Sequence, residues 1–232
     1  MASFVSFELT GKVAVLRMDD GKANALSDQM ITELDEALDR ACKEASAVVL
    51  AGRPERFCAG FDLRAMMAGP ASARALLVRG AKLYTKLYGL PVPLVIACTG
   101  HALAGGALVM LTGDLRLVSA GAYRIGLNEV AIGLPVPVLA QALARDRLTP
   151  GELSRATLLA RIYTPEEAVR AGYADEVVPV DEVLARAQAE AGKLAELSRQ
   201  AFHATKLRLR GATIAHIENT LESDLRGLMP GG

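Results

Sequence analysis

The sequence predicts an α/β fold in which most neighbouring strands run parallel. Over about the first 180 residues, short β-branched runs alternate with segments of helical periodicity, which is the pattern of strand–helix–strand units. From Asp181 onward the periodicity is helical and no strand signal follows. We therefore expect an α/β core over residues 1–180 and a helical C-terminal region over residues 181–232.

The strands of the core are expected where β-branched and aliphatic residues gather in short runs. The N-terminal segment "MASFVSFELTGK" alternates as a strand does, and it lacks the basic start of a signal peptide. The further runs are "KVAVLRM" (12–18), "AVVLAG" (47–52), "PLVIACTG" (93–100), "DLRLVSA" (114–120) and "DEVVPV" (175–180).

Helices are expected between these strands. The segment 27–45 carries an apolar stripe at helical spacing, formed by Met30, Ile31, Leu34, Leu38 and Ala41. Residues 70–89 and 105–113 also have helical character. Each of these segments is long enough to cover a sheet and connect parallel strands.

Two later helices have clear start signals. "TPGE" (149–152) and "TPEE" (164–167) each place Thr at the N-cap, Pro at the first helical position and Glu at the third. Gly172 is expected to end the second of these helices, because glycine readily adopts the left-handed conformation found there.

Composition excludes several classes of partner. The 232 residues include 26 basic and 26 acidic side chains, and only 4% are aromatic, so no basic nucleic-acid surface is expected. No apolar run approaches the roughly 20 residues that cross a bilayer, so no membrane association is expected. Cys42, Cys58 and Cys98 are scattered, which favours reduced, buried thiols and a cytoplasmic protein.

Several common catalytic and metal-binding motifs are absent from the sequence. No GxSxG, GxGxxG or GxxxxGK[ST] pattern occurs, which disfavours a serine-hydrolase elbow and a phosphate-binding loop. His101, His203 and His216 lack the spacing of metal ligands, so no metal site is expected.

Three segments are candidates for chemistry. "ERFCAGFDL" (55–63) places a glycine turn after an apolar run, and "GHALAGGALVML" (100–111) opens a helix whose free N–H groups suit an anion. "YRIGLNEVAIGLPVP" (123–137) places Glu129 among apolar residues, where burial would raise its pKa towards the range useful for proton transfer. Each segment alone is also compatible with a structural role: a turn, tight helix packing, or a solvated loop glutamate.

Taken together and in order, these segments resemble the crotonase superfamily, the enoyl-CoA hydratase/isomerase family. The resemblance spans nearly the whole chain, through "KANAL" (22–26), "FCAGFDL" (57–63), "GHALAGGALVMLTGDLRL" (100–117), "IGLNEVAIGL" (125–134) and "TPEEAVRAGYADEVV" (164–178). It implies a spiral of ββα units and a C-terminal helical region that builds homotrimers, often paired into hexamers. It also implies an enzyme of fatty acid metabolism that binds an acyl-CoA and stabilises the enolate of its thioester. No cofactor is implied, because coenzyme A is part of the substrate.

The resemblance also assigns roles to individual residues. The backbone N–H groups of Phe61 and Gly105 correspond to the oxyanion hole, which binds the thioester oxygen as it gains charge. Met66 and Leu108 are expected in the acyl pocket. Lys206 corresponds to a possible phosphate contact. The residues expected to line the coenzyme A site are Ala23, Ala25, Ala59, Asp62 and Leu63.

Leu108 decides which reaction the sequence favours. Family hydratases carry one glutamate in the helix after the glycines and another in the later loop, and the two hold a water between them. Here the helix position is Leu108 and only the loop carboxylate, Glu129, remains. A single carboxylate suffices for a Δ3,Δ2-enoyl-CoA isomerase, in which one base moves a proton from C2 to C4. We therefore expect that reaction, with Glu129 as the proton shuttle.

Two alternatives remain open at this stage. One is an enoyl-CoA hydratase, or another crotonase-type lyase or hydrolase, whose second acid comes from elsewhere, with Asp62 and Asp114 as local candidates. The other is a non-catalytic acyl-CoA-binding scaffold, which the presence of Glu129 beside both oxyanion-hole positions disfavours.

Overall fold

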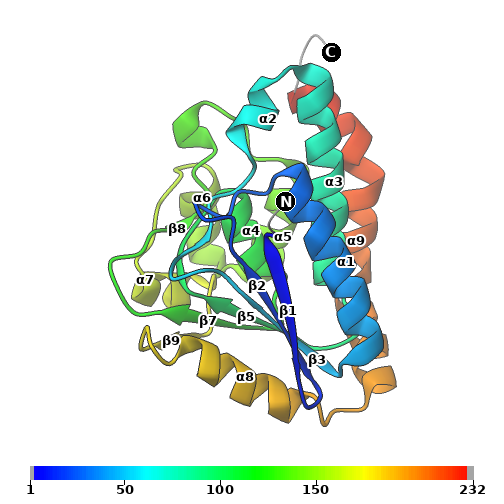
Figure 1. The fold of residues 1–232 in the computed structure, drawn as a ribbon. Coiled ribbons are helices and arrows are strands. Elements are labelled where there is room, and N and C mark those ends of the chain that lie inside the picture. Colours follow the sequence, from blue (N-terminus) through cyan, green and yellow to red (C-terminus); the bar gives the residue numbers. More distant parts are fainter. Residues whose placement is uncertain (1–2, 229–232) are drawn as a thin grey trace.

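A computed structural model describes residues 3–228 and contains two sheets, with successive strands of the chain placed in one and then the other from β3 to β8 (Figure 1). The larger sheet has the strand order β1-β2-β3-β5-β7-β9, and the smaller has the order β4-β6-β8. Neighbouring strands are parallel except for β1 and β2, which form an antiparallel hairpin. The strands of the larger sheet are β1 (Val5–Thr10), β2 (Val13–Met18), β3 (Ala47–Ala51), β5 (Leu94–Cys98), β7 (Leu115–Ser119) and β9 (Glu176–Val178). Those of the smaller sheet are β4 (Glu55–Cys58), β6 (Gly100–Leu103) and β8 (Ile125–Gly126).

Helices surround both sheets. They are α1 (Asp28–Glu44), α2 (Leu63–Met67), α3 (Pro70–Tyr88), α4 (Gly105–Thr112), α5 (Val138–Arg147), α6 (Pro150–Thr157), α7 (Pro165–Ala171), α8 (Val183–Leu194) and α9 (Arg199–Leu228). A short 3-10 helix, η1 (Val130–Ile132), follows β8. Three successive turns of the chain each add one strand to each sheet and then a helix: β3–β4–α3, β5–β6–α4 and β7–β8–α5. The predicted α/β fold with parallel sheets is confirmed, and its ββα turns form the expected spiral.

Each central strand of the larger sheet is buried on both faces. Val48 and Leu50 of β3 point into the main core beside α1, whereas Val49 points towards α8. Figure 1 shows α8 lying across one side of the sheet while α1, α3 and α9 stand together on another side. This two-sided cover explains why the strands appear in the sequence as continuous hydrophobic runs rather than alternating ones.

The smaller sheet is the main feature that the sequence did not predict. The run 93–100, expected as one strand, is divided between β5 and β6, with Thr99 between them. Gly100 makes the crossing possible, because a Cβ there would overlap the backbone of Glu55 in β4. Helices α2 and α5 were also not predicted from periodicity.

The two predicted capping boxes differ in outcome. At the start of α7, the Thr164 hydroxyl accepts from the Glu167 amide and the Glu167 carboxylate accepts from the Thr164 amide, so this box is confirmed. Gly172 ends α7 with φ 95°, as predicted. At the start of α6, Thr149 is the N-cap residue but its side chain makes no capping hydrogen bond. The prediction of a full box is wrong there, because Glu152 instead accepts from Arg155 and from Tyr163 Oη.

The sequence expectations about the α1 stripe and the cysteines agree with the structure except at Cys42, which was expected to be buried. The apolar stripe of α1 is buried as predicted. Cys58 and Cys98 are buried free thiols, and Cys42 is a half-buried one. Between residues 3 and 228, no helix is both long enough and apolar enough to span a membrane.

Candidate active site

A cavity of about 670 Å³ lies where the smaller sheet meets α2, α3 and α4. Its described lining is apolar or glycine except for two adjacent side chains, Asn128 and Glu129. The residues that line it are Ala59, Phe61, Leu63, Met66, Gly69, Pro70, Ala73, Leu77, Leu103, Ala104, Gly105, Leu108, Asn128, Glu129, Ile132, Leu134, Pro135, Pro137 and Leu228. Such a cavity suits a hydrocarbon chain that ends at a few polar groups.

The amide of Phe61 is free to bind a ligand. Phe61 follows a turn at Gly60, which has φ 90° and therefore favours glycine. The neighbouring backbone groups are engaged with Leu26, whose amide donates to Gly60 O at 2.8 Å and whose carbonyl accepts from Asp62 N at 3.3 Å. Within residues 3–228 the Phe61 amide has no acceptor. The turn therefore presents one unpaired donor at the cavity wall.

The second donor is the amide of Gly105, at the first position of α4. A first-turn helical amide has no partner within its own helix, and this one has none elsewhere in the described chain. The preceding residue, Ala104, has φ 48° and ψ −122°, an unusual conformation that sets the plane of the Ala104–Gly105 peptide. Backbone strain at a non-glycine residue is typical of functional sites.

The two donors lie close together because glycines let their backbones touch. A Cβ at Gly60 would lie 3.0 Å from Gly105 N, and a Cβ at Gly105 would lie 3.2 Å from Gly60 Cα. At Gly106 a Cβ would overlap the carbonyl of Cys58. These glycines therefore do allow tight backbone packing, which was their alternative structural explanation. The same packing brings the two amides together.

Glu129 is a buried carboxylate in the cavity wall. It is 8% exposed and lines the cavity, so the alternative of a solvated loop glutamate is wrong. Burial raises its pKa above the ordinary value. Its Oε2 atom is buried and has no hydrogen-bond partner among the described residues. A carboxyl in this state binds a proton more readily than an exposed one, as a general base requires.

No second carboxylate lines the described part of the cavity. Leu108 does line it, and this side chain is 3% exposed. Asp62 caps α2 by accepting from Arg64 N at 2.8 Å, and its side chain does not line the cavity. Asp114 is paired with Lys206 and Arg210, away from the cavity. The two acids considered as local alternatives are therefore wrong as partners of Glu129.

The residues expected to line a coenzyme A site fall into two groups. Ala59 and Leu63 line the cavity directly, whereas Asp62 between them does not; Met66, expected in the acyl pocket, also lines it. Ala23 and Ala25 lie in a neighbouring loop that is tied to the same segment, since the Ala59 amide donates to Ala23 O at 3.1 Å. The structure thus brings the two sequence segments together, and their contact with coenzyme A stays a prediction.

The loop that carries Ala23 and Ala25 is held by a buried asparagine. Asn24 has φ 54°, and its side-chain amide donates to the carbonyls of Met18 and Phe57 at 2.9 and 3.2 Å. The Asp20 carboxylate accepts from the amides of Asn24 and Ala25. This fixes the loop against the end of β4, beside the turn that carries Phe61.

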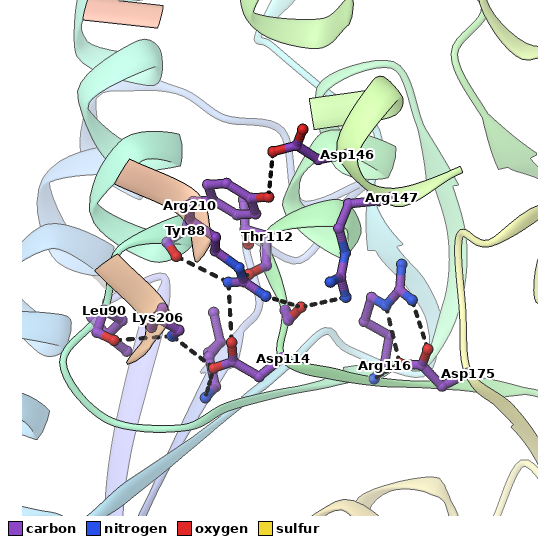
Figure 2. Close-up of polar contacts among 12 residues, drawn as sticks. Tyr88, Leu90, Thr112, Asp114, Arg116, Asp146, Arg147, Asp175, Lys206 and Arg210 are labelled. Carbon is purple, nitrogen blue, oxygen red and sulfur yellow. Dashed lines mark hydrogen bonds and ion pairs between the residues drawn. The ribbon is translucent and has the colours of Figure 1, made fainter. Parts of the chain in front are cut away.

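Lys206 does not have the role expected from the sequence. It is 5% exposed, and its Nζ donates to Asp114 Oδ2 at 2.7 Å and to Leu90 O at 2.9 Å. Figure 2 shows the Lys206 ammonium group and the Arg210 guanidinium both directed at the Asp114 carboxylate. The expectation of a phosphate contact is wrong because this ammonium group is buried and already paired.

Some lining residues were missed at the sequence level. Asn128 stands next to Glu129, and its Oδ1 is buried without a hydrogen-bond partner in residues 3–228. Ala73 and Leu77 of α3 face the cavity one helical turn apart, a spacing visible in the sequence but indistinguishable from ordinary core packing. Leu228, at the end of α9, has no local signal that would link it to the site.

Comparison with known proteins gives a consistent result. A family model described as enoyl-CoA hydratase/isomerase matches residues 8–228. Enoyl-CoA delta isomerase 1, mitochondrial, from Homo sapiens is 29% identical over 94% of this chain and 74% of its own length. A short-chain-enoyl-CoA hydratase from Clostridium acetobutylicum is 31% identical over 86% of this chain and 80% of its own. An apo structure of a Mycobacterium tuberculosis protein described as an enoyl-CoA isomerase has a TM-score of 0.93 and 37% identity, covering 99% of this chain and all of that one. A crystal structure of the same Mycobacterium tuberculosis protein, described there as a probable enoyl-CoA hydratase, has a TM-score of 0.91 and 38% identity, covering 95% of this chain and 94% of that one.

Proposed function

This chain belongs to the enoyl-CoA hydratase/isomerase family, and we propose that within it the protein is a Δ3,Δ2-enoyl-CoA isomerase with Glu129 as the proton shuttle. One observation carries the proposal: Glu129 is the only ionisable side chain among the described residues of the cavity wall, and Leu108 lines the same wall. The similarity to a human enoyl-CoA delta isomerase supports it.

The proposed reaction begins with the thioester oxygen accepting hydrogen bonds from the Phe61 and Gly105 amides. Glu129 removes a proton from C2, and the electron pair spreads over C4 and the thioester as a dienolate. The protonated Glu129 then returns the proton at C4, so that the double bond moves from C3–C4 to C2–C3. Each oxyanion-hole donor contributes about 2.7–4 kcal/mol of transition-state stabilisation.

The apolar lining has a defined part in this mechanism. Leu108 offers no group that could orient a water, so it helps to keep water away from the dienolate. Coenzyme A would extend along Ala59, Asp62 and Leu63 and the loop of Ala23 and Ala25, and no further cofactor is needed. We expect the protein to assemble as a trimer or a dimer of trimers, which light scattering would detect.

An enoyl-CoA hydratase is the second candidate. The observation that favours it is the unpaired Oδ1 of Asn128 beside Glu129, since these two oxygens could hold a water between them. A hydratase from Clostridium acetobutylicum is also among the similar proteins. An amide cannot give up a proton as a carboxylic acid does, so this arrangement would hydrate less efficiently than two glutamates.

Assaying the purified protein with a 3-enoyl-CoA and the matching 2-enoyl-CoA side by side tests the proposal. We expect the 3-enoyl-CoA to become a 2-enoyl-CoA of unchanged mass with the absorbance of a conjugated thioester. Hydration would instead add the mass of water to the 2-enoyl-CoA. Strong hydration with weak isomerisation would overturn the isomerase proposal in favour of the hydratase. Turnover of neither substrate would favour the non-catalytic scaffold.

A further inference from the structure

Tyr84 is a buried side chain of α3 that contacts both residues of the oxyanion hole. Its hydroxyl donates to Gly105 O at 3.0 Å. Its ring packs edge-on against the Phe61 ring, with the centroids 6.1 Å apart and the planes at 86°. Tyr84 is 1% exposed and does not line the cavity, so it contacts the two oxyanion-hole residues from the protein core and not from the cavity.

These contacts leave little freedom for either residue. A Cβ at Gly105 would lie 2.5 Å from Tyr84 Oη, which shows how closely the hydroxyl approaches the start of α4. On the other side, the Phe61 ring lies on the bare backbone of Gly80, where a Cβ would overlap it. Gly80 and Tyr84 are one helical turn apart on the same face of α3. That face therefore supports the Phe61 ring and the Gly105 carbonyl together.

We propose that Tyr84 is a positioning residue that holds the Phe61 and Gly105 amides in a common geometry for binding the thioester oxygen. This rests on the proposed role of those two amides. An oxyanion hole stabilises charge only if its donors are fixed before the charge develops. Phe61 lies in a turn and Gly105 at the start of α4. Tyr84, on α3, contacts both of these residues and so links the turn and α4 through a third element.

The hydroxyl is suited to this task because it keeps its proton. Burial raises the pKa of Tyr84 well above the ordinary value, and the nearby Cys58 and Glu129 raise it further. The hydroxyl therefore stays a donor over the whole pH range in which Glu129 acts. Removing it alone, by Tyr84→Phe, leaves the ring contact with Phe61 in place and removes the side-chain hydrogen bond to the Gly105 carbonyl, while the bond of that carbonyl within α4 remains.

The chain provides a matched control in Tyr88→Phe. Tyr88 lies one turn further along α3, is 2% exposed, and its hydroxyl donates to the Asp146 carboxylate at 2.8 Å. Each substitution removes the hydroxyl of a buried tyrosine and one hydrogen bond, which is buried at Tyr84 and part-buried at Tyr88, so each should lower the melting temperature by about 2–4 °C. Only Tyr84→Phe should lower kcat, by about 10- to 100-fold, with KM changed less than about threefold.

A second measurement does not depend on which reaction the protein catalyses. Acetoacetyl-CoA is a β-keto thioester, and its bound enolate can be followed by ultraviolet absorbance as pH is raised. We expect Tyr84→Phe to need a higher pH than the wild type for half-conversion to enolate, and Tyr88→Phe to match the wild type. If the wild type proves not to be an isomerase but this shift is found, the positioning role stands and only the isomerase proposal fails. Equal enolisation and equal kcat in Tyr84→Phe and Tyr88→Phe would overturn the positioning role.

Discussion

Burial of Glu129 lowers the stability of the folded protein at neutral pH, and the same burial raises the pKa of this carboxyl as a general base requires. The side chain is buried, its Oε2 lacks a hydrogen-bond partner within residues 3–228, and burial raises its pKa. Because folding raises this pKa, the folded state binds the proton more tightly than the unfolded chain does. The contribution of Glu129 to stability therefore falls as pH rises from about 4.5, its unfolded value, through the higher folded value.

Glu129→Gln should separate stability from activity. Turnover should fall by about 10²–10⁴-fold, because the base is lost while the shape is kept. The melting temperature of the variant should exceed that of the wild type at neutral pH, and the difference should shrink as pH falls towards 5. Thermal unfolding across this range and initial rates with a 3-enoyl-CoA measure both effects. Unchanged turnover would remove Glu129 from the mechanism.

Leu108 should control the balance between isomerisation and hydration. In Leu108→Glu a second carboxylate would face the cavity that holds Glu129, and like charges would raise the pKa of one of them. Such a pair could hold a water, so hydration of a 2-enoyl-CoA should rise relative to isomerisation. Stability should drop, because a charge replaces a buried leucine.

Leu108→Met is the matched control for this substitution. It keeps the site apolar at similar volume and should leave the product ratio unchanged. Both variants should be compared as folded protein, checked by circular dichroism. Strong hydration by the wild type would show that Leu108 does not limit hydration, and strong hydration by Leu108→Met would show that a second carboxylate is not what hydration requires.

At the scale of elements, the capping sequences predicted where helices begin but not every bond at their ends. Thr149 and Thr164 both precede helices with proline in the first turn, as their motifs indicate. Only Thr164 completes its box, because Glu152 is drawn into contacts with Arg155 and Tyr163. Those contacts depend partly on a residue 11 positions along the chain, which a four-residue motif does not contain.

Thr164→Ala should therefore cost more stability than Thr149→Ala. Loss of a capping side chain costs about 0.5–2 kcal/mol, and Thr164 accepts such a bond from Glu167 N. The Thr149 side chain makes no capping bond, so its removal should cost less. Urea unfolding of the two variants compares them directly. Equal losses would mean that the bond at Thr164 contributes nothing to the difference.

The smaller sheet shows where periodicity fails as a predictor. Strand β8 has two residues, and β4 and β6 have four each, too few for an alternating pattern to stand out. The catalytic candidates were nevertheless found, because they lie in the glycine-rich segments that follow these strands. The family resemblance of these segments taken together, and not any one motif, singled out Phe61, Gly105 and Glu129, whereas hydrophobic runs predicted the strands of the larger sheet.

At the scale of the whole molecule, the missed features are contacts between distant parts of the chain. The sequence places Lys206 in the helical tail and suggests a phosphate contact. In the structure its ammonium group is instead paired with Asp114, 92 positions earlier in the chain. The same carboxylate pairs with Arg210, which also donates to the carbonyls of Tyr88 and Thr112 (Figure 2). This cluster joins α9 to the end of α4 and to the segment before β5. Nothing in the sequence near Lys206 or Arg210 identifies their partner.

Asp114→Asn tests how far the molecule depends on that cluster. The side chains of Lys206 and Arg210 are 3% and 5% exposed, and the substitution leaves both cations without their anion. Breaking a buried ion pair in this way costs about 3–5 kcal/mol, which in a chain of this length lowers the melting temperature by roughly 6–20 °C.

The exposed pair Arg40–Glu44 provides the comparison for this substitution, since its side chains are 55% and 40% exposed. Glu44→Gln should cost less than about 1 kcal/mol, because solvent screens such a pair. Adding Lys206→Met to Asp114→Asn should restore part of the loss, because one unpaired buried cation is then removed. A loss in Asp114→Asn no larger than that in Glu44→Gln would show that α9 is held by its apolar contacts with α3 and α5 and not by the ion pairs.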